Sequence, residues 1–274
     1  MTLSGPFRGL LLLALAVRLL AVGASFTVPR ALALRNYAPA PDMCTGLGDL
    51  LRRRPSCSPI AEDEYAYDAL GRSVAAGHGL VLSYSWVYGT GHAPTAYGNF
   101  LYPAFVGAVY AVSGGSALAL ELLQALLGAL AVVAVALAAR DLAGQRAGVT
   151  VGLVAALHPG LILSSVLVMT EALEVPILVA LFLMWTRFVR APSGRGAVLV
   201  GALAAAACLT RSPALYAVPV MCVATLAGRD ARAALRPRLV LGAAAVAVLL
   251  MLPWTVRNAV RFSAFVPADT KAGA

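Results

Sequence analysis

Seven runs of apolar residues, separated by polar segments, recur along the chain. They cover residues 8–29, 116–139, 147–168, 172–189, 197–210, 213–227 and 239–253. Most of them approach the length of about 20 residues that an α-helix needs to cross a bilayer. A weaker amphipathic run at 100–114 is shorter, and we expect it to lie as a juxtamembrane helix at the interface. The pattern predicts an all-α polytopic membrane protein with about seven spans.

The composition agrees with this class. The chain has 274 residues, of which 61% are hydrophobic and 12% are charged, whereas soluble domains carry about 25% charged residues. The mean hydropathy is +0.84. The first apolar stretch is long, contains Arg18 and lacks a small-residue cleavage signal, so we expect a retained helix rather than a cleaved signal peptide.

The arginines predict the orientation in the membrane. The short connections 140–146, 187–196 and 228–238 are rich in Arg, which is typical of cytoplasmic loops. The N-terminus is then cytoplasmic, and the whole stretch 30–115 forms one external loop with juxtamembrane helices. The net charge of +9 comes largely from arginines in these loops and is explained by the membrane topology, so we expect no nucleic-acid partner. We expect an integral protein of a bacterial plasma membrane, and its oligomeric state stays open.

The external loop concentrates acidic residues. Half of the twelve Asp and Glu residues lie between Asp42 and Asp68, with Asp63 and Glu64 at the centre of the densest group. Such a cluster favours a general base, a cation site or a sugar-binding site. Two plainer interpretations remain, because Asp63 is also a good N-cap for a short helix closed by Gly77, and the cluster also suits a solvated face.

A second group of charged residues falls on the same predicted side. Glu171 lies at the turn between two apolar runs, and Arg211 lies between two short runs and therefore below the outer surface. An arginine at that depth requires an anionic partner or an aqueous cavity. Arg211 is thus either a ligand for phosphate or carboxylate or the structural partner of Glu171 or Glu174.

Several other features are weaker or ambiguous. Cys44 and Cys57 form a disulfide only if the external loop meets an oxidising compartment. His158-Pro159 predicts a kink rather than a metal site, and no HExxH, paired CxxC, P-loop or GxSxG motif is present. Three further arginines are minor candidates, and we expect the first of them to snorkel toward the interface: Arg18, Arg72 and Arg257.

These residues suit sugar transfer from a lipid-linked donor. A carboxylate would deprotonate the acceptor, and an arginine or a bound cation would stabilise the departing phosphate. The motifs also resemble GT-C type membrane glycosyltransferases of the family-39-like group, which includes protein O-mannosyltransferases and the lipid A aminoarabinose transferase. The matching stretches are Asp63-Glu64-x-x-Tyr67, Thr95-Ala96-Tyr97, Leu101-Tyr102-Pro103, 122–129, 159–171, Leu209-Thr210-Arg211-Ser212-Pro213 and Pro253-Trp254-Thr255-Val256-Arg257-Asn258.

The resemblance implies one GT-C-like module over residues 1–274. It implies that Asp63 and Glu64 are catalytic, and that a polyprenyl-phosphate sugar is the donor for a lipid, glycan or protein acceptor. The expected substrate-binding residues are Tyr67, Glu171, Arg211 and Arg257. No metal ligand is assigned, and a divalent cation is the only cofactor considered.

The chain departs from the family pattern in two places. Gly98-Asn99 stands where the family usually has Pro-Pro, and the chain stops at Ala274, where relatives continue with a further C-terminal part. The alternative function is therefore a non-catalytic membrane protein, either a glycolipid carrier or a truncated, inactive glycosyltransferase fragment.

Overall fold

The computed structural model describes residues 5–27, 62–82, 93–96, 98–216, 219–221 and 237–269. Nearly all of this part is helical, which confirms the all-α class. The disulfide hypothesis for Cys44 and Cys57 and most of the apolar run 213–227 lie outside the described residues. In chain order the elements are α1 (Gly5–Thr27), α3 (Glu62–Ala75), β1 (Val81–Leu82), β2 (Ala93–Pro94), α5 (Leu101–Ser113), α6 (Ala117–Leu157), α7 (Pro159–Leu163), α8 (Glu171–Arg190), α9 (Gly194–Thr210) and α12 (Pro237–Phe262).

Four of the described helices, α1, α6, α8 and α12, are long and apolar enough to cross a membrane. Of these, α6 is two helices joined at Gly144, where a φ of 87° breaks the helical geometry. The two arms fold back on each other, because a Cβ on Gly148 would lie 2.8 Å from the carbonyl oxygen of Ala136. In a straight helix those residues would be about 18 Å apart. The first arm therefore corresponds to the run 116–139 and the second to the first half of the run 147–168, and the total of seven spans stays a prediction.

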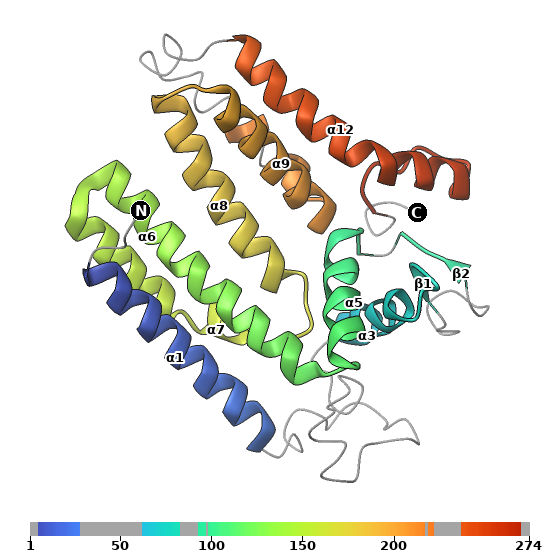
Figure 1. Cartoon of the computed structure of the whole chain (residues 1–274), viewed down its shortest axis with the longest axis horizontal. Coiled ribbons are helices and arrows are strands. Elements are labelled where there is room, and N and C mark those ends of the chain that lie inside the picture. The colour runs from blue at the N-terminus through green and yellow to red at the C-terminus, as the bar shows by residue number, and fades with distance from the viewer. Residues whose placement is uncertain are drawn as a thin grey trace.

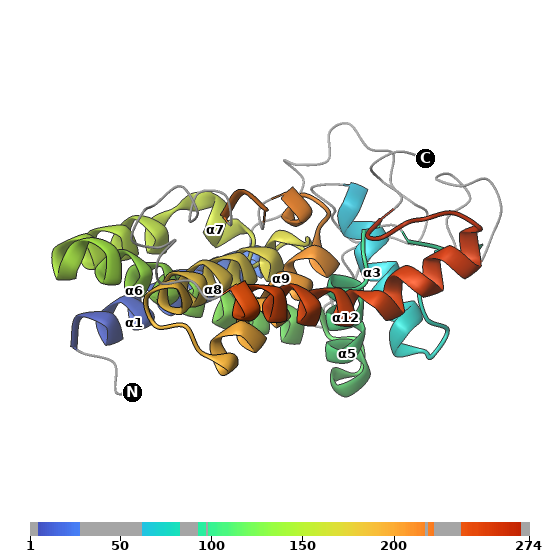
Figure 2. The same ribbon diagram turned by 90° about the horizontal axis from the view of Figure 1, so that it is seen from above.

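The long helices pack side by side in chain order. Helix α1 contacts α6, α6 contacts α8, α8 contacts α9, and α9 contacts α12, so that they form the flattened layer seen in Figures 1 and 2. Helices α3 and α5 and the two-stranded β1–β2 sheet gather at one end of this layer (Figure 1). At the other end Asp141 pairs with Arg140 and Arg187, at 2.7 and 3.0 Å, and joins α6 to α8.

Helices α3 and α5 form a closely packed pair. Each carries a glycine at the crossing: a Cβ on Gly71 would lie 2.3 Å from Cγ1 of Val106, and a Cβ on Gly107 would lie 2.5 Å from Cγ1 of Val74. The 13 residues of α5 span roughly 20 Å, which is short of a hydrocarbon core of about 30 Å. Helix α5 packs chiefly on α3, and its juxtamembrane placement stays a prediction.

A buried polar contact fixes this pair. The carboxylate of Asp68 accepts hydrogen bonds from the phenol of Tyr110 at 2.7 Å and from Nε of Arg72 at 2.9 Å. The chain leaves α3 at Gly77, whose φ of 80° belongs to the left-handed region, as expected for a residue that closes a helix. Helix α3 begins at Glu62, so Asp63 lies in its first turn and is not the N-cap.

We predict that Gly107→Ala destabilises the protein. The new methyl group would meet Val74 and the carbonyl oxygen of Gly71 at 3.1 Å, and overpacking of this kind costs about 1–3 kcal/mol. Thermal unfolding in detergent should show a melting temperature lower by several degrees. Gly242→Ala is the matched control, because no atom lies within 4 Å of a Cβ there. An equal melting temperature for both variants would contradict the close crossing.

Candidate functional site

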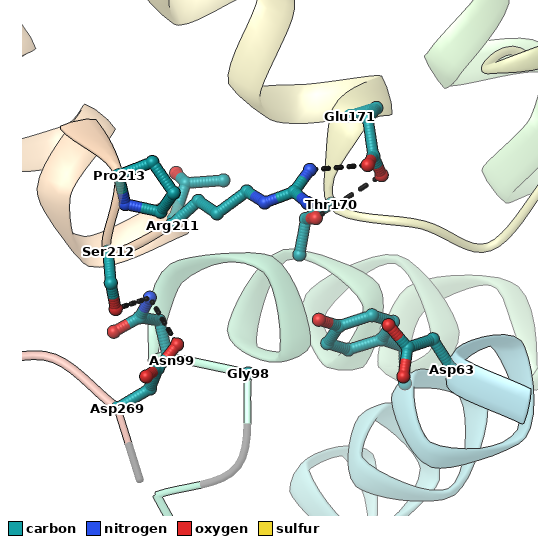
Figure 3. A pocket seen from close by; sticks show the side chains of 11 residues that line it. Asp63, Gly98, Asn99, Thr170, Glu171, Arg211, Ser212, Pro213 and Asp269 are labelled. Carbon is teal, nitrogen blue, oxygen red and sulfur yellow. Dashed lines mark hydrogen bonds and ion pairs between the residues drawn. The ribbon is translucent and has the colours of Figure 1, made fainter. Parts of the chain in front are cut away.

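A polar cavity of about 220 Å³ lies where the N-terminal turns of α3 and α8 meet the C-terminal end of α9. The segments before α5 and after α12 complete its wall (Figure 3). Eleven residues from these five places line it: Asp63, Tyr67, Gly98, Asn99, Thr170, Glu171, Thr210, Arg211, Ser212, Pro213 and Asp269.

Helix α3 contributes Asp63 and Tyr67, which lie one turn apart and therefore share a face. The phenol of Tyr67 is buried and hydrogen-bonds the side chain of Thr170. Burial and, after it, the charge of Asp63 raise the pKa of Tyr67 above its ordinary value, so the phenol stays neutral. Gly98 allows the chain to pass the ring closely, since a Cβ there would lie 2.4 Å from Tyr67.

Glu64 does not line the cavity. It is buried, and its Oε1 accepts the backbone N–H of Val168 at 3.0 Å. Successive helical residues are turned by about 100°, so Asp63 and Glu64 face different directions even though they are adjacent in the sequence. The structure thus places Glu64 under the connection that leads to α8.

Arg211 follows the last turn of α9 and reaches the first turn of α8. Its Nη1 donates to the carboxylate of Glu171 and, at 3.3 Å, to that of Glu174. Both carboxylates lie at a helix N-terminus, which favours negative charge. Of the two alternatives for Arg211, the ion pair with Glu171 and Glu174 is thus present in the structure. Nε and Nη2 of Arg211 have no hydrogen-bond partner among the described residues, and the side chain is 42% exposed, so these donors are accessible to an anion.

The chain between α7 and α8 is irregular. Helix α6 ends at Leu157, and His158 caps the single turn of α7 by accepting the N–H of Leu161 at its Nδ1. This confirms the interruption that His158-Pro159 predicts. After Leu163 the backbone is non-helical until Thr170, so its N–H and C=O groups need partners outside a helix.

A buried glutamine, Gln124, is the hydrogen-bond partner of two carbonyl groups in this segment. Nε2 of Gln124 donates to the carbonyl oxygens of Ser165 and Leu167, at 3.3 and 3.1 Å. Its Oε1 accepts the phenol of Tyr102 at 2.8 Å. Together with Glu64 on the N–H of Val168, this network holds the segment that carries Thr170 and Glu171 to the cavity.

Arg257 lies apart from the polar cavity. Its Nη1 donates to the carbonyl oxygen of Thr95 at 2.9 Å, and its guanidinium stacks on Trp254 with 4.8 Å to the ring centroid. Both side chains line a second, largely apolar cavity of about 500 Å³ between α3, α5, α9 and α12. The two cavities are neighbours, because Leu209 and Phe100 line the apolar one and the residues next to them in sequence line the polar one.

The expectation that Arg18 snorkels is wrong. Its side chain is 1% exposed, and its Nη1 donates to the carbonyl oxygen of Ala14, one turn earlier in α1. Gly128 on α6 makes room for it, since a Cβ there would lie 2.7 Å from Nε of Arg18. The guanidinium is therefore packed between helices and does not reach the interface.

Asn99 and Asp269 are among the seven lining residues that were not foreseen as site residues. Nδ2 of Asn99 donates to Oγ of Ser212 and to Oδ2 of Asp269, both at 3.4 Å (Figure 3). The sequence signalled Asn99 only as a departure from Pro-Pro, and nothing near Asp269 distinguishes it from a solvated carboxylate. Within the described residues, no group of three or more His, Cys, Asp or Glu side chains is placed to hold a metal ion.

The family assignment agrees with this geometry. Residues 96–256 match the family described as dolichyl-phosphate-mannose-protein mannosyltransferase. The chain belongs to this family. It is accordingly a membrane glycosyltransferase of the GT-C type, and the resemblance of its motifs is confirmed. The match includes Asn99, Glu171 and Arg211 and begins after Asp63. No curated protein and no solved structure matches the chain.

We predict that Gln124→Leu destabilises this mannosyltransferase-family chain. The change leaves the carbonyl oxygens of Ser165 and Leu167 and the phenol of Tyr102 without their partner, and each unsatisfied buried group costs about 1–3 kcal/mol. Thermal unfolding should report the loss. Gln145→Leu, at the exposed turn of the same helix, is the control and should leave the melting temperature nearly unchanged. Equal stability of both variants would refute the holding role of Gln124.

Proposed function

We propose that the chain transfers a sugar from a polyprenyl-phosphate donor to a hydroxyl or amine acceptor on the external face of the membrane. One observation carries the proposal: Asp63 and Arg211, from segments far apart in the sequence, line the same polar cavity. A general base and a phosphate ligand are the two groups that such a transfer requires. The family match supports the reaction class, and its name supports a mannosyl donor.

The proposed reaction is a single inverting displacement. The acceptor oxygen or nitrogen attacks the anomeric carbon and gives its proton to the carboxylate of Asp63. The bond between that carbon and the phosphate oxygen breaks, and its electron pair leaves with the polyprenyl phosphate. Nε and Nη2 of Arg211 would then donate to the phosphate, while Glu171 and Glu174 hold Nη1. Glu171 thus acts by orienting the guanidinium.

Tyr67 and Glu64 take supporting roles in this proposal. Tyr67, kept neutral by burial, lines the cavity and holds the Thr170 side chain without adding charge beside Asp63. Glu64 positions the segment that precedes Glu171 through the N–H of Val168. This replaces the catalytic role that the resemblance implied for Glu64.

The apolar cavity suits the lipid part of the donor. It is lined by aliphatic and aromatic side chains of four helices and adjoins the polar cavity at Leu209 and Phe100. A prenyl chain placed there would set its phosphate near the polar cavity. Arg257 lies at the wall of the apolar cavity and, through Thr95 and Trp254, keeps that wall in place. We propose a structural role for Arg257 in donor binding.

We predict that Asp63→Asn abolishes transfer while the protein still folds. The amide cannot accept the acceptor proton, and loss of a general base lowers rates by about 10²- to 10⁴-fold. Membranes containing the variant would be supplied with radiolabelled dolichyl-phosphate mannose, and label in the acceptor fraction would be counted. Asp141→Asn is the control, because Asp141 pairs with Arg140 and Arg187 and does not line the polar cavity. Undiminished transfer by Asp63→Asn would refute the role of Asp63 as the general base.

We also predict that the end carrying α3 faces outside. In a variant with all four native cysteines replaced, His78→Cys should react with a membrane-impermeant maleimide on intact cells. Gln145→Cys, at the Gly144 turn beside the Arg-rich connections, should react only after permeabilisation. Both positions are exposed, so burial does not limit labelling. The reverse pattern would place the polar cavity in the cytoplasm and exclude donors displayed outside.

A further inference from the structure

We propose that Asn99 and Asp269 form the subsite that binds the sugar hydroxyls of the donor, an assignment that rests on the proposed function. Both residues line the polar cavity. Oδ1 of each is buried and has no hydrogen-bond partner among the residues that the structure describes. Asn99 is 1% exposed, so its free oxygen is enclosed by protein and the cavity. Two unused acceptors side by side mark a place for a ligand that donates hydrogen bonds.

The chemistry of the two oxygens selects the ligand group. A buried acceptor without a donor costs free energy, and a hydroxyl group restores the missing hydrogen bond. A phosphate offers only acceptors and negative charge, so the carboxylate of Asp269 would repel it. The polar cavity is therefore divided, with phosphate donors at Arg211 and sugar-hydroxyl acceptors at Asn99 and Asp269.

Three side chains of α12 place Asp269 at the cavity. Beyond Phe262 the chain folds back along the helix, and consecutive carbonyl groups at 266–268 are each bound. Nδ2 of Asn258 donates to the first at 3.1 Å, Oγ1 of Thr255 to the second at 3.4 Å, and Nε1 of Trp254 to the third at 2.7 Å. The Pro253-to-Asn258 motif thus ties down the residues directly before Asp269.

Asn99 is placed by an unusual turn. Gly98 and Asn99 have φ angles of 73° and 62°, in the left-handed region where Gly and Asn are the best-tolerated residues. Gly98 packs against the ring of Tyr67, and the turn then directs the amide of Asn99 toward Ser212 and Asp269. The pair that departs from the family's usual Pro-Pro is therefore the one that makes the subsite possible.

A divalent cation is the competing occupant. Calcium takes 6–8 oxygen ligands and magnesium demands an octahedral set, whereas the described residues offer two free oxygens here and no group of three acidic or imidazole ligands. Sugar hydroxyls need only one acceptor each, so the observed pair suffices for them.

The test compares donors that lack single hydroxyl groups. The purified chain, its Asp269→Asn variant and its Asn99→Gly variant would receive dolichyl-phosphate mannose or the 2-, 3-, 4- or 6-deoxymannose analogue. Glycine tolerates the φ of Asn99, and the asparagine at 269 keeps the side-chain shape. Transfer gives kcat/KM for each donor, and the ligand-induced shift in melting temperature gives binding without turnover. Asp141→Asn is the control.

In the wild-type protein we expect one deoxy donor to be about 10- to 100-fold worse than the intact donor, as for a hydrogen bond to a charged acceptor. In both subsite variants that ratio should fall to a few-fold, while the ratios for the other analogues stay unchanged. An unchanged ratio in both variants would overturn the subsite.

The remaining outcomes separate the subsite from the reaction. Selective thermal shifts without any transfer would overturn the proposed catalysis and keep the subsite. Transfer with the same kcat/KM for every deoxy donor would overturn the subsite and keep the proposed catalysis. Mg²⁺, Mn²⁺ or Ca²⁺ alone would also be titrated, and a saturable shift that disappears in Asp269→Asn would overturn the hydroxyl assignment in favour of a cation. Neither shift nor transfer with any donor would overturn both proposals.

Discussion

Backbone that leaves a helix inside a membrane protein needs protein or the water of a cavity as partner for its polar groups, because lipid offers none. Two such segments build the polar cavity. The connection before α8 is held by Gln124 and Glu64, and the chain after α12 is held by Trp254, Thr255 and Asn258. Each held segment ends at a residue that lines the cavity. The irregular parts of the site are thus fixed by side chains on regular helices, which is how a site gains precision.

The same constraint explains which polar residues are buried. Gln124 and Asn258 are almost fully buried. The side-chain amide of each donates to main-chain carbonyl oxygens rather than to a ligand. Arg257 does likewise with Thr95. Arg211 differs, since its partners are two carboxylates on one nitrogen and its other donors are accessible. The accessible N–H donors, more than depth in the membrane or charge, make Arg211 suited to bind phosphate, whereas Arg257 has a structural role.

Hydropathy and arginine counts were enough to predict the helices and to bring Asp63, Glu171 and Arg211 to one side, because these features depend on composition over long windows. They could not separate Asp63 from Glu64, since that depends on the helical turn between neighbours, and Glu64 and Asp68 share the face turned away from the cavity. Nor could they find Asp269, whose position depends on hydrogen bonds made by residues 11 to 15 positions earlier. Partners of buried polar groups are chosen by contact in space, and a single sequence does not record that contact.

The charge of the cavity bears on how a proposed product would leave. Three carboxylates and one guanidinium line it, so its formal charge is −2. A polyprenyl-phosphate sugar is a diester with one negative charge, whereas the free polyprenyl phosphate left after transfer carries about 1.5 to 2 negative charges near neutral pH. Repulsion from the lining therefore rises when the sugar departs, while Glu171 and Glu174 keep their hydrogen bonds to Nη1 of Arg211. A site that holds its phosphate ligand with one shared arginine binds the donor less tightly than two free arginines would. In the proposed reaction this weaker hold would favour release of the more highly charged product, which turnover requires as much as the chemical step.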